Sequence, residues 1–301
     1  MTALPAVALG PTAPLALSSA IAGGLALAFG GAPLGVLLIA RRMSLSGDAL
    51  SHGILPGAAV AFLLAGPDPW ALTLGALAAA LVVTSLSSLL ARTRRLPEDA
   101  AFAVIYLTAL AAGVVLLARR AGPEMLESLL FGAVSGLDRS GLVLAASAAT
   151  ASLVALALFI RGFVADSLDP GFLRAEGRVG GALHLLFMML VALNLVAGFR
   201  AFGALMTVGL MMIPAAGARF WAQGYAGQAA AAIAISAASG ALGVLIAARA
   251  GVEPGAVMVL CGGALFVLSG LAGPHGGLLE QLTARGRLTS PERLAGRPRS
   301  S

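Results

Sequence analysis

Long apolar stretches alternate with short polar connections along almost the whole chain of 301 residues. A helix needs about 20 apolar residues to cross the hydrocarbon core of a bilayer. The pattern predicts spanning helices near residues 15–40, 48–65, 70–91, 99–118, 141–160, 181–199, 201–218, 228–248 and 255–271. The seventh and ninth of these stretches are marginal in length. We therefore predict an all-α, polytopic transmembrane helical bundle with eight or nine spans.

The segments outside the predicted spans are few. Segment 124–137 is apolar but too short to cross, so we expect a re-entrant or interfacial helix there. From residue 273 the chain is rich in Arg, Gly, Pro and Ser, which predicts a basic, mostly disordered cytoplasmic tail. The N-terminus has no positively charged region, so we expect the first apolar stretch to remain as a span. The predicted organisation is a transmembrane domain over 1–272 and a tail over 273–301.

Composition agrees with a membrane location. Hydrophobic residues make up 59% of the chain and charged residues 11%. Soluble domains carry about 25% charged residues, so these charges are too few to cover a soluble surface. The net charge of +6 comes from 19 basic residues, all arginine, which lie between the apolar stretches and in the tail. Because aromatic residues do not interleave them, we expect no nucleic-acid partner.

The arginines predict an orientation. If the N-terminus lies outside, the inside connections and the tail hold most of the arginines, and the positive-inside rule favours that arrangement. Five arginines fall in outside connections, and Arg119 and Arg120 fit this orientation least well; the five are Arg119, Arg120, Arg139, Arg200 and Arg249.

Asp48 and His52 are an acid and a histidine four residues apart inside the second apolar stretch. On a helix this spacing places both side chains on one face. They could bind one divalent cation together, or they could simply hydrogen-bond each other within the bundle. Two ligands are too few for a tight zinc site, but an ion pathway must also release its ion. A symmetric dimer would supply two carboxylates and two imidazoles, and this ligand set suits zinc or manganese.

Other polar positions have simpler interpretations. His184, near the start of a span, is interpreted as an interfacial histidine rather than a ligand. Asn194 lies in mid-span and is expected to hydrogen-bond a neighbouring helix, with a pathway-lining role as the alternative. The chain has no lysine, so it cannot build a phosphate-binding Gly-x-x-x-x-Gly-Lys loop. With no His-Glu-x-x-His motif either, we expect the protein not to be an enzyme.

The inside connection 161–180 is the longest and is charged. Asp169 and Pro170 are good residues for a helix start, and Gly177 is a good stop. We therefore expect a short cytoplasmic helix between them. It would be either an ordinary linker or a helix that docks on a soluble partner.

Four segments together resemble one family. Residues 41–57 (RRMSLSGDALSHGILPG) are similar to the signature of the permease subunits of zinc, manganese and iron ABC importers. Three later segments resemble that family in the same order: 98–101 (EDAA), 169–177 (DPGFLRAEG) and 210–219 (LMMIPAAGAR). The resemblance runs from about residue 15 to residue 272, so the domain 1–272 would be the permease domain.

The resemblance implies a permease subunit that moves a divalent transition metal ion, zinc first and manganese second, across the bacterial cytoplasmic membrane. It would act as a homodimer bound to cytoplasmic ABC ATPase subunits and fed by an extracytoplasmic metal-binding protein. No permanently bound cofactor is implied, only the transported Zn²⁺ or Mn²⁺. Asp48 and His52 would be pathway ligands. The residues implied in coupling to the ATPase are Asp169, Pro170, Arg174, Glu176 and Gly177.

A different class of transporter is also compatible with the residues. In a secondary transporter coupled to cations or protons, Asp48 and His52 would act as a proton relay. Dependence on an ATPase partner separates the two hypotheses.

Overall fold

The computed structural model describes residues 13–66, 68–91, 98–118, 139–168, 178–252 and 254–280. These residues form helices and short connections, with no strand among them. The helices are α1 (Ala13–Ala40), α2 (Ser44–Gly53), α3 (Leu55–Ala65), α4 (Pro69–Ala91), α5 (Glu98–Ala118), α7 (Arg139–Leu168), α9 (Arg178–Phe202), α10 (Ala204–Ala218), α11 (Tyr225–Ala250) and α12 (Pro254–Ala272).

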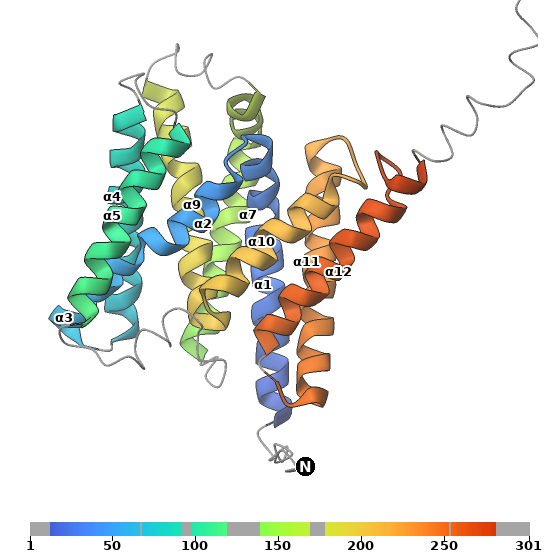
Figure 1. The fold of residues 1–301 in the computed structure, drawn as a ribbon, viewed down its shortest axis with the longest axis horizontal. Coiled ribbons are helices and arrows are strands. Elements are labelled where there is room, and N and C mark those ends of the chain that lie inside the picture. Colours follow the sequence, from blue (N-terminus) through green and yellow to red (C-terminus); the bar gives the residue numbers. More distant parts are fainter. Residues whose placement is uncertain are drawn as a thin grey trace, which may run out of the picture.

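Within the described residues, seven helical segments are long and apolar enough to cross a membrane. One of them joins α2 and α3, over Ser46–Ala65. Two shorter apolar helices cover Ala100–Leu116 and Met206–Ala218, inside α5 and α10. The chain runs back and forth between the two ends of the molecule (Figure 1). The predicted polytopic helical bundle is therefore confirmed.

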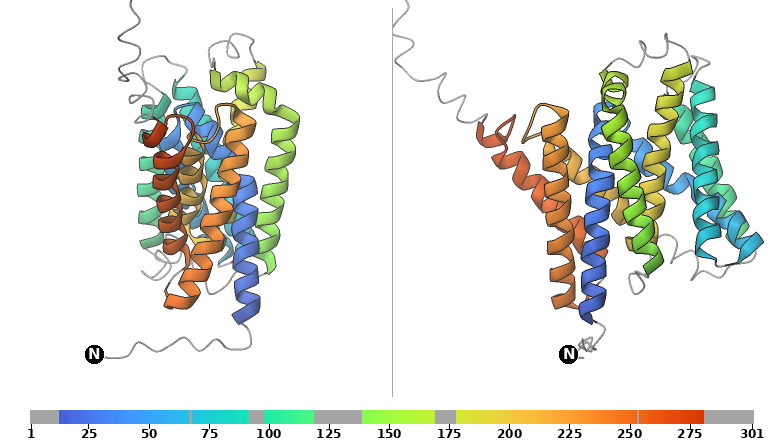
Figure 2. Two further views of the ribbon diagram at one scale, coloured as in Figure 1. Left: turned by 90° about the vertical axis from the view of Figure 1, so that its right-hand side faces the viewer. Right: turned by 180° about the vertical axis from the view of Figure 1, so that it is seen from behind.

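The helices are arranged around α1, which packs against α7, α9, α10 and α11. Helices α3, α4 and α5 pack against one another at one side of the bundle, and α11 and α12 lie at the other (Figures 1 and 2). Helix α2 crosses the bundle obliquely between these two sides, in contact with α1, α5, α9 and α10. It thus connects the two halves of the molecule.

Local sequence explains several helix ends. Asp68 accepts a hydrogen bond from the backbone N–H of Ala71 at 2.7 Å, and Pro69 occupies the first helical position of α4. An acidic cap followed by proline is a favourable helix start. Helix α11 ends at Gly251, whose φ of 67° is the left-handed conformation that glycine adopts without steric cost.

The second predicted span differs from the expectation of one continuous helix. It begins earlier, at Ser44, and it breaks at Ile54 between α2 and α3. Pro56 follows two residues after the break and has no N–H to donate to the carbonyl of His52. A proline inside a helix removes that hydrogen bond and disfavours the helical conformation before it. The break at Ile54 therefore lies two residues after His52.

The charged connection 161–180 is shorter than predicted. Helix α7 continues to Leu168 and α9 begins at Arg178. The apolar stretch ends near residue 160, but the backbone hydrogen bonds of a helix do not require apolar side chains. The predicted short helix over 169–177 and the predicted re-entrant helix over 124–137 lie outside the described residues.

The beginning of the predicted tail is attached to the bundle. The backbone N–H of His275 donates to the carbonyl of Phe220 at 3.0 Å, in the connection between α10 and α11. The imidazole Nδ1 of His275 lies 3.5 Å from Nε2 of Gln223. The prediction of disorder for 281–301 lies outside the described residues.

Candidate metal-binding site

Asp48 and His52 lie on one stripe of α2, as their spacing predicts. Oδ1 of Asp48 is 4.0 Å from Nε2 of His52, which is too long for a direct hydrogen bond. Ser44, a further four residues back, is also exposed on this stripe. The two side chains therefore share a face without pairing directly, and an ion or water could lie between them.

The pair faces away from the core of the protomer. The side chain of Asp48 is 59% exposed and that of His52 is 34% exposed. Between the two along α2, Leu50 is fully buried and Ala49 and Ser51 are nearly so. The helix thus uses its small and apolar residues for packing and leaves its ionisable residues open.

Helix α2 is held in this orientation by the turn at its start and by packing along its length. At its start, Arg42 adopts a φ of 60°, and the N–H of Met43 donates to the carbonyl of Leu38 at 2.9 Å. This tight turn sends α2 back across the bundle from the end of α1. Along its length, Gly47 lies so close to Leu38 and Met211 that even a methyl group would contact both.

The described residues contain no cluster of three or more His, Cys, Asp or Glu side chains able to hold a metal ion. The described part of a single chain therefore offers a carboxylate and an imidazole at this place. Carboxylate oxygen and imidazole nitrogen both suit divalent first-row metals. Two such ligands can bind an ion weakly, and further ligands would have to come from water or from another chain.

The other predicted polar positions do not join the pair. His184 lies on α9 and is half-buried. Asn194 is buried in the bundle, where its Nδ2 donates to Ser152 Oγ on α7 at 2.6 Å and to the carbonyl of Leu190 at 2.8 Å. The expected hydrogen bond from Asn194 to a neighbouring helix is therefore confirmed.

The residues predicted to couple to an ATPase are not described by the structure. Asp169, Pro170, Arg174, Glu176 and Gly177 all fall in the gap between α7 and α9. The two flanking helices are described. Helix α7 ends, and α9 begins, on the side of the molecule where the turn between α1 and α2 lies (Figure 1).

Sequence reasoning missed one polar cluster, formed by Arg41 and the last turns of α7. The sequence places Arg41 in the arginine bias and at the start of the segment 41–57, and Asp166 among the charges of the connection 161–180, with nothing to join the two. The structure instead buries both side chains and joins them in an ion pair of 2.8 Å. Asp166 lies two residues before the end of α7, and its position in the sequence does not by itself identify its partner.

Comparison with known proteins places the chain in a family. Residues 15–273 match the ABC 3 transport family. The zinc transport system membrane protein TroC of Treponema pallidum is 31% identical over 283 residues, covering 91% of this chain and 94% of that protein. The manganese transport system membrane protein MntC of Bacillus subtilis is 30% identical over 266 residues, covering 86% of this chain. The chain spans 61% of the length of that relative.

A solved structure agrees with the fold. The structure of PsaBC from Streptococcus pneumoniae in complex with Fab superposes with a TM-score of 0.76 at 25% identity, covering 90% of this chain and 95% of that one. These comparisons confirm the resemblance that the four sequence segments indicated. The chain belongs to the ABC 3 transport family.

Proposed function

We propose that this chain is the permease subunit of a bacterial ABC importer for a divalent transition metal ion. One observation carries the proposal: Asp48 and His52 lie side by side on the exposed face of a broken spanning segment. Interrupted helices with ionisable residues at the break are typical of substrate sites in transporters. Membership of a transport family and the names of the relatives support the same conclusion.

The exposure of Asp48 argues for a second copy of the chain. A charged side chain facing lipid costs roughly 2.5–3.5 kcal/mol on insertion scales, so such residues face protein or water. A symmetric homodimer with its two α2 stripes facing each other would cover both carboxylates. It would also bring two carboxylates and two imidazoles to one axis, which is a complete ligand set for a tetrahedral ion.

Zinc is the proposed cargo ahead of manganese. At a given site with nitrogen and oxygen ligands, zinc binds more tightly than manganese, and imidazole is a common ligand of zinc. Among the relatives, TroC is named for zinc and MntC for manganese. Uptake of the two metals measured side by side decides between them.

Energy for transport would come from a separate cytoplasmic ABC ATPase. The chain has no lysine and hence no phosphate-binding loop of the usual type. Residues 169–177 are the proposed docking segment for that ATPase, because they resemble the coupling loop of the family. An extracytoplasmic metal-binding protein would deliver the ion at the other face of the cytoplasmic membrane.

The test is metal uptake in a bacterial strain that lacks its own zinc and manganese importers. The permease is expressed with its ATPase, and uptake of labelled zinc and manganese is measured separately. Asp48→Ala and His52→Ala are each expected to abolish uptake while the protein still reaches the membrane, because each removes one ligand from each protomer.

Matched controls use the same residue types away from α2. Asp68→Asn keeps a good capping residue on α4, and His275→Gln changes an exposed histidine near Gln223. Both are expected to transport normally. Normal uptake by the Asp48 and His52 variants would refute the pathway role. Uptake that survives an inactive ATPase but stops when the proton gradient is dissipated would instead favour the secondary transporter.

A further inference from the structure

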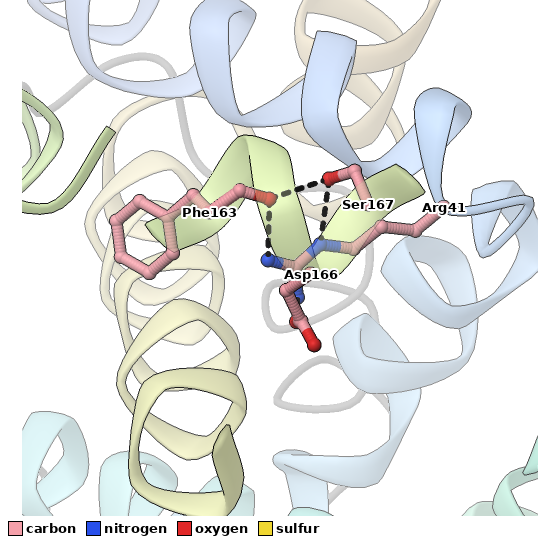
Figure 3. Close-up of polar contacts among 4 residues, drawn as sticks. All are labelled: Arg41, Phe163, Asp166 and Ser167. Carbon is pink, nitrogen blue, oxygen red and sulfur yellow. Dashed lines mark hydrogen bonds and ion pairs between the residues drawn. The ribbon is translucent and has the colours of Figure 1, made fainter. Parts of the chain in front are cut away.

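Arg41 ties the end of α1 to the end of α7. Its side chain is only 3% exposed, and Nη1 lies 2.8 Å from Oδ2 of Asp166. Nε donates to Ser167 Oγ at 3.2 Å, and Nη2 donates to the carbonyl of Phe163 at 3.3 Å. Figure 3 shows the guanidinium enclosed by these three residues of α7. Because Asp166 and Ser167 belong to the last turn of α7, they directly precede segment 169–177.

The same guanidinium also contacts α9. Cζ of Arg41 lies 4.0 Å from the ring centroid of Phe187, within the range of a cation–π interaction. Phe187 is fully buried, and its ring packs against that of Phe163 with centroids 5.8 Å apart. Arg41 therefore touches both helices that flank segment 169–177.

On its own chain, Arg41 is almost adjacent to the helix that carries the candidate metal ligands. Only Arg42 and Met43 separate it from the start of α2. The turn is short and hydrogen-bonded, and Arg42 holds a left-handed conformation. Arg41 is therefore closely connected to the start of α2, whose second turn carries Asp48.

We propose that Arg41 is a positioning residue that transmits movement between the ends of α7 and α9 that flank segment 169–177 and the Asp48/His52 pair. This inference rests on the proposed function, in which that segment docks an ATPase and the pair passes a metal ion. The physical basis is the buried ion pair: separating Arg41 from Asp166 would leave both charges buried without a partner, which is strongly unfavourable. The ends of α7 and α9 and the turn before α2 therefore move as one body.

Arginine is required for this role rather than any cation. Its planar guanidinium addresses a carboxylate, a hydroxyl and a carbonyl at once and still presents a flat face to Phe187. Lysine keeps the charge beside Asp166, but it has a single nitrogen and cannot hold all of these partners together.

The experiment measures how many metal ions are transported for each ATP hydrolysed. The permease is purified with its ATPase and reconstituted in proteoliposomes, with zinc as the probe. For Arg41→Lys and Arg41→Gln we expect this ratio to fall by about five- to tenfold, as for the loss of a typical allosteric coupling. The zinc concentration for half-maximal uptake should stay unchanged, because Asp48 and His52 are intact.

Two controls distinguish a loss of coupling through Arg41 from a loss of ATPase binding and from misfolding of the variant. Arg42→Lys changes the exposed neighbour and should leave the ratio unchanged. Asp169→Ala should weaken association with the ATPase, whereas the Arg41 variants should still assemble. Since Arg41→Lys keeps the charge beside Asp166, it remains testable if Arg41→Gln does not fold.

An unchanged ratio in folded, assembled Arg41→Lys would overturn the positioning role, because a purely structural residue lowers stability without altering coupling. Failure of the proposed function looks different: the unaltered permease and its ATPase would then show no ATP-dependent zinc or manganese uptake.

Discussion

Charged residues are rare in this chain, and two of them, Arg41 and Asp48, have opposite surroundings. The side chain of Arg41 is almost completely buried and paired with Asp166, whereas that of Asp48 is mostly exposed. A buried ion pair with several hydrogen bonds holds helices in one arrangement, although its net contribution to stability can be small. An open carboxylate is available to a passing ion. The two residues thus differ in role because their surroundings differ.

At the residue scale, Gly30 in α1 lies at a point where three helices pack tightly. A Cβ at this position would overlap Oδ1 of Asn194 and lie 2.8 Å from Cα of Ala149. We expect Gly30→Ala to lower the free energy of unfolding by about 1–3 kcal/mol, because α1 must move away from α7 and α9. Thermal unfolding of the detergent-solubilised protein measures the change.

Gly24 in the same helix provides the matched control for Gly30. A Cβ there would meet no atom within 4 Å. Gly24→Ala should therefore leave stability unchanged or raise it by up to about 1 kcal/mol through helix propensity. Equal melting temperatures for the two variants would contradict the packing described around Gly30.

At the scale of elements, the break between α2 and α3 governs the site. After the break, α3 follows a different direction from α2 and packs closely on α4 and α5. Gly57 of α3 and Gly75 of α4 face each other so closely that a Cβ on either would overlap the carbonyl of the other. A Cβ on Gly113 of α5 would lie 3.0 Å from the backbone nitrogen of Pro56, which is tight but not an overlap of the same size. Small residues at helix contacts allow this approach in a membrane, where packing drives association.

Enlarging this contact should disturb transport. Gly75→Ala would force α3 away from α4, and α3 is connected to His52 through Ile54. We expect a loss of about 1–3 kcal/mol of stability and reduced metal uptake. Gly263→Ala on α12, where a Cβ would meet nothing within 4 Å, is the control and should retain full uptake. Full uptake by Gly75→Ala would mean that the position of α3 does not affect the pair.

At the scale of the whole molecule, the stripe of α2 that carries Ser44, Asp48 and His52 is not covered by other helices of the same chain. Ser44 and Asp48 are exposed, His52 is half-buried, and α2 lies on the opposite side of α1 from α7 (Figures 1 and 2). In the proposed homodimer this stripe faces its counterpart across the metal pathway.

Disulfide cross-linking tests that arrangement. In a Cys261→Ser background, Ser44→Cys should give a covalent dimer on oxidation in membranes, because Ser44 shares the stripe with Asp48. Leu158→Cys is the comparison, since its side chain is 71% exposed and belongs to α7 rather than to α2. Cross-linking at Leu158 but not at Ser44 would show that a different face forms the dimer.

Much of the architecture followed from the sequence because it depends on local properties. The length of each apolar stretch located the helices to within a few residues at most ends, and the four-residue spacing placed Asp48 and His52 on one face. The exceptions have local causes too: α7 extends past its apolar stretch, and Pro56 interrupts the second span.

The tertiary structure decided what depends on distant residues. Arg41 and Ser167 are 126 positions apart, and their contact arises only when α1 and α7 pack together. The exposure of Asp48 likewise depends on which side of α2 packs against α5 and α10. Spacing along a chain determines which side chains share a helix face, whereas only packing determines whether that face is buried, paired or open.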